Sequence, residues 1–303
     1  MRIALVISVL CYLLNTKKHK KRNKQVKENK TKKKLRGGYY TPADLSHFLV
    51  KWVAEKNPKT LLEPSCGDGA FFEALKSFDV PAKTTAIEFD KTEAGKARAR
   101  AQHLDLPEMT VKTGDFLGWA TDALKTKKRF DAVIGNPPFI RYQYLPPEFQ
   151  HYAEGIFSNL DCKFTKHTNA WVPFILASFE LLNPEGRLAM VVPAEIIHVT
   201  HAQSLRTYLG REASRLVIVD PQELWFEGTL QGAVLLLAEK KARPSEHSEG
   251  LGIYPVKGRS FTTQNPTEIF TSPQAINGKT VEGKWTRALL SAGTRNLLDG
   301  LED

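Results

Sequence analysis

The residues with the clearest chemical signature are Asn136, Pro137, Pro138 and Phe139, which follow an apolar run at 130–134. Two prolines fix the backbone, so the carbonyl of Pro137 and the side-chain oxygen of Asn136 can both accept hydrogens of one amino group while Phe139 stacks on the attached ring. A planar amino nitrogen is a poor nucleophile because its lone pair is delocalised. Two acceptors draw it toward tetrahedral geometry and stabilise the positive charge that develops during methyl transfer. The motif therefore indicates methylation of a planar amine or amide.

A second candidate site is the loop 63–71, which reads Glu-Pro-Ser-Cys-Gly-Asp-Gly-Ala-Phe and follows an expected strand at 60–63. Gly67 and Gly69 allow the backbone to approach a ligand closely. Glu88 stands about 20 residues further on, where a carboxylate can accept both ribose hydroxyls of a nucleoside. The loop lacks a third glycine at dinucleotide spacing and a Lys-Ser or Lys-Thr pair for a triphosphate. S-adenosylmethionine, a nucleoside without phosphate, fits this loop better.

A third loop, Thr113-Gly114-Asp115-Phe116, follows an expected strand at 110–112. Asp115 can accept a hydrogen bond from an adenine amino group, and Phe116 can pack on the adenine ring. A simple turn with a solvated carboxylate is the alternative. Because the loop follows the strand after the one that ends in Glu88, the cofactor interpretation is favoured.

The cysteines and histidines indicate no metal or redox chemistry. The three cysteines are far apart and form no C-x-x-C pair, so neither a disulfide framework nor a zinc site is expected. Cys66 is interpreted as a small packing residue, since amino methylation needs no covalent enzyme intermediate. His198 and His201 are three residues apart, but no carboxylate or cysteine completes a metal set.

The elements that must position these loops alternate between apolar runs and helical patterns, which is typical of a doubly wound parallel sheet. Thr41 and Pro42 are expected to open a helix, as its capping residue and its first residue. Strands are expected at 60–63, 84–88, 110–112, 130–134 and 186–192, with a long apolar helix at 171–182 before the last of them.

Two further apolar runs, 215–220 and 231–239, are too close together for a crossover helix and should pair antiparallel. The sequence therefore predicts an α/β fold of the Rossmann-like, S-adenosylmethionine-dependent methyltransferase type. Its sheet should be mostly parallel and seven-stranded, with an antiparallel terminal hairpin. This hairpin distinguishes the chain from a plain nucleotide-binding dehydrogenase.

The net charge of +10 is concentrated at one end of the 303-residue chain. Residues 1–36 hold 13 of the 43 Lys and Arg, which leaves 30 of them against 32 Asp and Glu in the remainder. The lysine-rich part is either a DNA-binding arm or, as we favour, a disordered solubilising segment. The apolar run 3–14 is too short to span a bilayer, and a non-native or mis-assigned start is favoured over a signal anchor.

Three regions are expected on these grounds. Residues 1–36 would be a disordered or non-native tail, 37–240 the catalytic domain, and 241–303 a linker with the beginning of a further region. A cytoplasmic protein without membrane association is expected.

The order of Tyr40-Thr41-Pro42, the Glu63 loop and Asn136-Pro-Pro-Phe resembles that of the class gamma amino-methyltransferases of bacterial restriction–modification systems. The resemblance covers about 37–240, and the run 135–143, Gly-Asn-Pro-Pro-Phe-Ile-Arg-Tyr-Gln, is similar to DNA enzymes of that class, which methylate adenine N6. It implies S-adenosylmethionine as cofactor. The residues that it implies for cofactor binding are Tyr40 and Thr41 at the methionine end, Glu63 near the amino group, Ser65, Gly67 and Gly69 in the loop, Glu88, Asp115 and Phe116 at the adenosine, and Asn136.

The resemblance also implies double-stranded DNA as substrate. Adenine N6 inside a duplex cannot reach a cofactor at a sheet edge, so the base must be flipped out. Phe226 matches the aromatic residue that stacks on the far face of the flipped base, opposite Phe139, although an aromatic between two strands is as often a core residue. Arg141, Tyr142 and Gln143 either contact DNA near the target or form hydrogen bonds within a surface loop.

Other functions fit part of the pattern. The same Asn-Pro-Pro-aromatic logic serves a protein glutamine or an RNA base, and a non-catalytic DNA-binding or specificity module could keep these loops as a scaffold. Intact Asn136, Glu88 and both loop glycines argue against the last. The resemblance also implies a target-recognition domain after the catalytic domain, so 241–303 would be a linker and the start of an incomplete target-recognition region. Because a neutral body also binds a polyanion poorly, we expect a truncated chain or half of a split enzyme whose recognition part is a second polypeptide.

Overall fold

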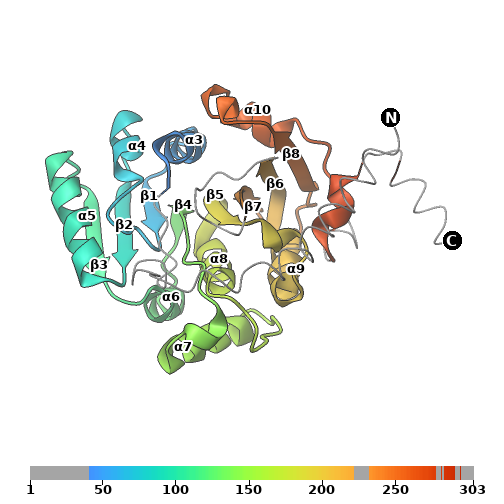
Figure 1. The fold of residues 1–303 in the computed structure, drawn as a ribbon, viewed down its shortest axis with the longest axis horizontal. Coiled ribbons are helices and arrows are strands. Elements are labelled where there is room, and N and C mark those ends of the chain that lie inside the picture. The colour runs from blue at the N-terminus through green and yellow to red at the C-terminus, as the bar shows by residue number, and fades with distance from the viewer. Residues whose placement is uncertain (1–40, 222–231, 278–280, 282, 291–293, 295–303) are drawn as a thin grey trace, which may run out of the picture. The chain divides into compact units, whose positions relative to one another are not determined.

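The computed structural model describes residues 41–221, 232–277, 281, 283–290 and 294. All described residues belong to one compact unit, 37–303. This unit is built on one eight-stranded sheet with the order β3-β2-β1-β4-β5-β7-β6-β8 (Figure 1). The strands are β1 (Thr60–Glu63), β2 (Lys83–Glu88), β3 (Met109–Thr113), β4 (Phe130–Gly135), β5 (Leu182–Pro193), β6 (Ala213–Pro221), β7 (Ala233–Lys240) and β8 (Gly250–Val256).

Helices cover both faces of this sheet because alternate strand residues point to opposite sides. Leu61 and Val191 belong to one buried cluster, whereas their neighbours Leu62 and Val192 belong to another. The helices on the first face are α3 (Ala43–Ala54), α4 (Phe72–Ser77), α5 (Lys91–His103) and α10 (Pro266–Thr271). Those on the second face are α6 (Phe116–Lys125), α7 (Pro147–Asn159), α8 (Trp171–Glu180) and α9 (Gln203–Glu212).

Strand pairing confirms the predicted α/β class. Strands β1 to β5 pair in parallel through β3-β2-β1-β4-β5, and β7 pairs antiparallel with both β5 and β6. The predicted antiparallel pair is therefore β6 with β7. The predicted number of seven strands is corrected to eight, because β8 pairs parallel on the outer side of β6.

Strand β8 has an unusual sequence for a strand, which explains why the pattern did not predict it. It contains Gly250, Gly252 and Pro255, residue types that weaken strands and occur mainly at edges. Gly250 has a φ of 95°, and a Cβ there would lie 2.0 Å from the carbonyl oxygen of Ile276. Only glycine fits this close approach, and the contact with residue 276 comes from far along the chain.

The segment after residue 240 also anchors α10 to the sheet. The guanidinium of Arg215, on β6, donates from Nε to the carbonyl of Phe270 at 2.8 Å and from Nη2 to those of Thr271 and Pro273 at 3.0 and 2.6 Å. Residues 250–273 therefore contribute to the same unit as the preceding strands. The assignment of 241–303 to a target-recognition region stays a prediction.

The first described helix starts differently from the expectation. Pro42, not Thr41, is the N-cap of α3, and no side chain caps that helix. The hydroxyl of Thr41 accepts a hydrogen bond from Nδ2 of Asn136 at 3.3 Å instead. Thr41 therefore connects the start of α3 to the loop after β4. No helix among the described residues is long and apolar enough to cross a bilayer.

Candidate active site

The loops after β1 and β4 meet at the carboxyl edge of the sheet. These strands are parallel neighbours, with Leu62 paired to Val133. The hydroxyl of Ser65 donates to the carbonyl oxygen of Asn136 at 3.1 Å, and a Cβ on Gly135 would lie 3.3 Å from Cδ of Pro64. Beyond β1 the sheet continues to β2 on one side and to β4 on the other, so the two loops meet at a topological switch point, where open α/β sheets bind ligands.

The loop of Asn136 is held from three directions. The side-chain nitrogen of Asn136 donates to Thr41, and this bond fixes the orientation of the amide group, including its oxygen Oδ1. Pro137 is buried, and Phe139 is partly buried against the core on the second face of the sheet. The amide of Ala170 donates to the carbonyl of Ile140 at 2.8 Å and ties the end of the loop to α8. The predicted catalytic residues are thus fixed at both ends of one short segment.

Glu88 is part of the glycine loop's own structure. Its Oε2 accepts from the amide of Gly67 at 2.9 Å, and its Oε1 accepts from the amide of Asp90 at 2.8 Å. Burial raises the pKa of Glu88, although these two bonds oppose the shift. Each carboxylate oxygen has a second lone pair, so the group can accept from a ligand's hydroxyls while it still holds the loop.

Gly69 is the loop position where only glycine fits. Its φ is 89°, and a Cβ there would lie 2.6 Å from Cδ2 of Phe72, a fully buried ring. Replacing Gly69 by alanine should move either the loop or α4. We expect Gly69→Ala to weaken binding of S-adenosylhomocysteine by about tenfold or more, since strain and overpacking at such a site each cost about 1–3 kcal/mol. Isothermal titration calorimetry measures this loss, and unchanged affinity would contradict it. Gly95→Ala on α5, where no atom lies within 4 Å of the new Cβ, is the matched control.

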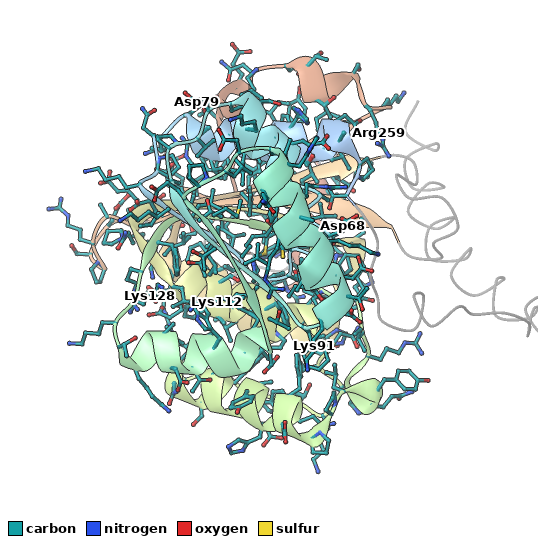
Figure 2. The ribbon with its side chains drawn as sticks, turned by 90° about the vertical axis from the view of Figure 1, so that its left-hand side faces the viewer. Asp68, Asp79, Lys91, Lys112, Lys128 and Arg259 are labelled. Carbon is teal, nitrogen blue, oxygen red and sulfur yellow. The ribbon has the colours of Figure 1, made fainter. Side chains whose placement is uncertain are left out.

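Glu63 ends β1 as a carboxyl group with no exposed surface, and neither of its oxygens has a hydrogen-bond partner among the described residues. Burial, followed by the charges of Glu88 and Asp68, raises the pKa of Glu63 to about 8. Asp68 lies beside α5 (Figure 2), where Nη2 of Arg100 approaches its Oδ2 at 3.7 Å. An unpaired buried carboxyl at a ligand-binding edge fits the cationic part of a ligand.

Asp115 and Phe116 both have structural roles in α6. Asp115 is the N-cap, and its Oδ2 accepts from the amide of Gly118 at 2.9 Å. Phe116 is 2% exposed and packs with Phe174 and Trp119, at ring-centroid distances of 4.9 and 6.2 Å. Contact of Phe116 with a cofactor would therefore require its neighbours to move, and the predicted ligand roles of this pair stay predictions.

Phe89 was missed by the sequence analysis. It follows Glu88 directly at the end of β2, and 72% of its surface is exposed. An exposed ring of this size beside the Glu88 carboxylate can pack on the base of a nucleoside. Its position in the sequence could have identified it, since an aromatic residue just after the end of a parallel strand lies at the sheet edge where ligands bind rather than in the core.

Other predicted residues have a different status. Tyr40 and Phe226 lie outside the described residues, so their roles stay predictions. Arg141 and Gln143 are exposed beyond the catalytic loop, which is compatible with either of the interpretations left open for them.

Among known families, the Eco57I restriction-modification methylases match residues 3–225. The chain belongs to this family. The predicted kinship with restriction–modification amino-methyltransferases is thereby confirmed.

Curated relatives of this Eco57I-family chain include several modification enzymes. Type II methyltransferase M.AccI of Acinetobacter calcoaceticus is 26% identical over 202 residues, 66% of this chain and 36% of the relative. Type II methyltransferase M.TthHB8I of Thermus thermophilus is 26% identical over 265 residues, 85% of this chain and 56% of the relative. The tRNA1(Val) (adenine(37)-N6)-methyltransferase of Porphyromonas gingivalis is 27% identical over 153 residues, 49% of this chain and 56% of the relative. The chain thus spans about a third to just over half the length of these relatives.

Solved structures share the fold of this Eco57I-family chain. The type IIG restriction endonuclease BpuSI superposes with a TM-score of 0.62 at 13% identity, over 85% of this chain and 33% of that one. The methyltransferase subunit of a type I restriction-modification system from Streptococcus thermophilus has a TM-score of 0.58 at 18% identity, over 82% of this chain and 52% of that one. The predicted methyltransferase fold is confirmed.

Cys66 and the histidine pair can now be located in this Eco57I-family fold. Burial, followed by the charge of Glu63, raises the pKa of the buried Cys66 thiol, which suits the predicted packing role. A carboxylate lies beside His201, since Oε1 of Glu195 is 3.9 Å from its Nε2. Within the described part of the chain, no group of three His, Cys, Asp or Glu residues is arranged to hold a metal ion.

Proposed function

We propose that this protein transfers a methyl group from S-adenosylmethionine to N6 of adenine in DNA, in the cytoplasm, as part of a restriction–modification or similar defence system. The observation that carries the proposal is the contact between Ser65 and Asn136. It joins a glycine loop suited to a nucleoside cofactor to a loop suited to a planar amine. Donor and acceptor of the methyl group would therefore meet at one sheet edge.

The described residues at this edge fit S-adenosylmethionine. Glu63 is an unpaired buried carboxyl suited to the cofactor's cationic methionine end, Glu88 can accept from the ribose hydroxyls, and the exposed ring of Phe89 can cover the base. When bound, the cofactor supplies an electrophilic methyl group. Gly67 and Gly69, with φ values of 56° and 89°, let the loop backbone follow it closely.

The residues of the catalytic loop would activate the target. Oδ1 of Asn136 and the carbonyl of Pro137 accept the two N6 hydrogens, which localises the nitrogen lone pair and stabilises the charge that develops on the nitrogen. Phe139 stacks on one face of the extruded adenine, and Phe226 is proposed for the other. Bonds from Ser65 and Ala170 hold this loop before the substrate arrives, so little reorganisation is needed on binding.

Adenine and DNA are each favoured by a different comparison. The name of the Porphyromonas relative specifies adenine N6 in tRNA, and the matching family is named for restriction-modification methylases. Adenine N6 is thus the proposed target atom and DNA the proposed polymer. RNA is the second candidate, because of the tRNA relative.

Selection of the DNA sequence to be methylated is proposed to depend on parts outside the catalytic region, among them a separate recognition polypeptide. Residues 37–303 hold 30 Lys and Arg against 32 Asp and Glu, and a neutral body supplies little phosphate affinity. A structural neighbour is the methyltransferase subunit of a type I system, which is one component of a larger assembly.

The decisive experiment offers methyl-labelled S-adenosylmethionine together with DNA, RNA and protein, digests each polymer and identifies the labelled product. Label in N6-methyladenine from DNA supports the proposal. Label in tRNA adenine would favour the second candidate, and label in glutamine or cytosine would contradict both. The Asn136→Ala variant provides the background in every arm.

The raised pKa of Glu63 predicts a pH dependence of cofactor binding. A carboxyl with a pKa of about 8 is mostly protonated at neutral pH, and it must lose its proton to pair with a cation. Affinity should therefore rise with pH toward 8, by at most about tenfold per pH unit, and level off above it. Calorimetric titration with S-adenosylhomocysteine in two buffers of different ionisation enthalpy measures both affinity and proton release.

The variant Glu63→Gln cannot be charged, so it should bind more weakly at pH 8.5 and lose most of the slope. A smaller slope can remain at lower pH, since burial also raises the pKa of Glu88. Glu73→Gln, an exposed change on α4, should behave as wild type. A flat affinity profile for the wild type between pH 6 and 8 would show that Glu63 is not coupled to the ligand.

A further inference from the structure

Glu195 joins two segments of the chain on the second face of the sheet. It lies in a short 3-10 helix, η3 (Ala194–Ile197), immediately after β5. Its Oε1 accepts from Nδ2 of Asn169 at 3.0 Å and from Nε1 of Trp171 at 3.3 Å. The Glu195 side chain is 21% exposed, and Trp171 has no exposed surface. One carboxylate therefore fixes both residues that flank Ala170.

Ala170 is one of the residues that hold the loop of Asn136. Its amide donates to the carbonyl of Ile140 at 2.8 Å, and Ile140 follows Phe139 directly. Gly135 on β4 pairs with Met190 on β5, so the loop after β4 and the η3 helix after β5 leave the same edge of the sheet. A shift of Ala170 would thus be transmitted to the end of the Asn-Pro-Pro-Phe segment.

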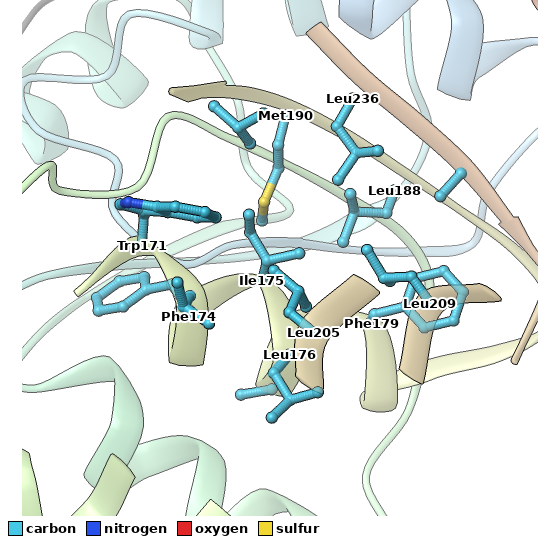
Figure 3. Close-up of a cluster of buried hydrophobic side chains, with 14 of the residues drawn as sticks. Trp171, Phe174, Ile175, Leu176, Phe179, Leu188, Met190, Leu205, Leu209 and Leu236 are labelled. Atoms are coloured by element: carbon cyan, nitrogen blue, oxygen red, sulfur yellow. The ribbon is translucent and has the colours of Figure 1, made fainter. Parts of the chain in front are cut away.

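The start of α8 has little other polar support. Its N-cap is Ala170, which makes no side-chain capping bond. A carboxylate near the amino end of a helix is favourable, because that end carries partial positive charge and unsatisfied amides. Trp171 belongs to the same buried cluster as Ile175 and Met190 (Figure 3), so its ring anchors α8 to β5 while Nε1 binds Glu195.

We propose that Glu195 is a positioning residue for methyl transfer: by fixing Asn169 and Trp171 it sets the Ala170–Ile140 hydrogen bond, and with it the placement of Phe139 and Asn136. This inference rests on the proposed function of the Asn136 loop. In this role Glu195 acts through Asn169 and Trp171 rather than on the reacting atoms. Small displacements of reacting groups are costly, and about 1 Å can reduce a rate about 100-fold.

The experiment compares Glu195→Ala with Glu195→Gln, whose amide oxygen can still accept from Asn169 and Trp171. Alanine is expected to lower kcat about 10- to 100-fold with the KM for cofactor unchanged, and glutamine should stay within about threefold of wild type. Glu154→Ala, an exposed change on α7, is the matched control and should leave kcat unchanged. Thermal unfolding identifies any variant that fails to fold.

A second readout does not depend on activity. Hydrogen exchange, followed by mass spectrometry, should become faster in Glu195→Ala for peptides that contain 136–141 and 168–172, but not for peptides of β2 and α5. Glutamine should restore the wild-type pattern. A general loss of stability would speed exchange throughout and would contradict the specific coupling.

The two readouts separate the inference from the proposed function. If wild type methylates adenine in DNA and Glu195→Ala retains full kcat, the inference is overturned while the function stands. If wild type does not methylate DNA, the function is overturned, and exchange in 136–141 alone decides whether Glu195 holds the loop. Equal loss of kcat in the glutamine and alanine variants would also overturn the inference, because the acceptor atom would then not be the cause.

Discussion

Replacing Asn136 by alanine is expected to reduce methyl transfer by about 100- to 1,000-fold, the usual loss when one preorganised polar group that stabilises developing charge is removed. Oδ1 of Asn136 is proposed to accept one of the two N6 hydrogens, and alanine leaves only the carbonyl of Pro137. Affinity for S-adenosylhomocysteine should stay within about threefold, less than 1 kcal/mol, because the backbone carbonyl that binds Ser65 is retained.

Measurements of kcat and of cofactor affinity on the same preparation test this expectation. Asn159→Ala, an exposed change at the end of α7, controls for the loss of an amide elsewhere. Equal loss of activity and cofactor binding would assign Asn136 a structural role, through its bond to Thr41. Full activity would remove the loop from the mechanism.

Replacing Arg187 by methionine is expected to lower the free energy of unfolding by about 3 kcal/mol, the lower end of the range for breaking a buried ion pair. Arg187, on β5, has a side chain that is 9% exposed, and it binds Glu239 at 3.0 Å and Glu55 at 3.2 Å. It also donates to the carbonyl of Trp52 at 2.6 Å and lies 4.7 Å from the centre of that indole ring. Methionine retains much of the packing but removes all of these bonds, which leaves Glu239 with Lys56 and Glu55 with Thr267 as their remaining partners. The lower end applies because both carboxylates are partly exposed.

Urea unfolding and thermal melting measure this change, and the midpoint temperature should fall by about 6–12 °C for a domain of this size. The control is Arg211→Met, whose ion pair with Glu212 is exposed and should contribute less than about 1 kcal/mol. Equal effects of the two substitutions would show that burial of Arg187 does not determine its contribution. Because Arg187 lies away from the candidate active site, kcat of the folded protein should be unchanged.

Much of the fold could be predicted because the signals are local. The strands that end at Glu63, Glu88 and Gly135 are apolar runs followed by acidic, glycine or asparagine residues, and each was expected within a residue or two of its observed bounds. The antiparallel pairing of β6 with β7 followed from the short distance between them along the chain. Strand β8 could not be predicted, since it is rich in glycine and proline and forms by pairing with β6.

For the active site, local sequence patterns were enough to predict which residue types stand at the ends of the strands: the acceptors of the Asn136 loop, the glycines of the first loop and the carboxylate of Glu88. These are properties of short segments, and the hydrophobic pattern of each strand shows where the strand ends. Which of these groups lie next to one another became apparent from the three-dimensional structure. Asn136 is bonded to Thr41 and Ser65, which are distant from it along the chain. The packing that buries Phe116 and the connection from Glu195 through Trp171 and Ala170 to Ile140 also involve distant residues. Such contacts depend on strand order and register, which no local pattern specifies.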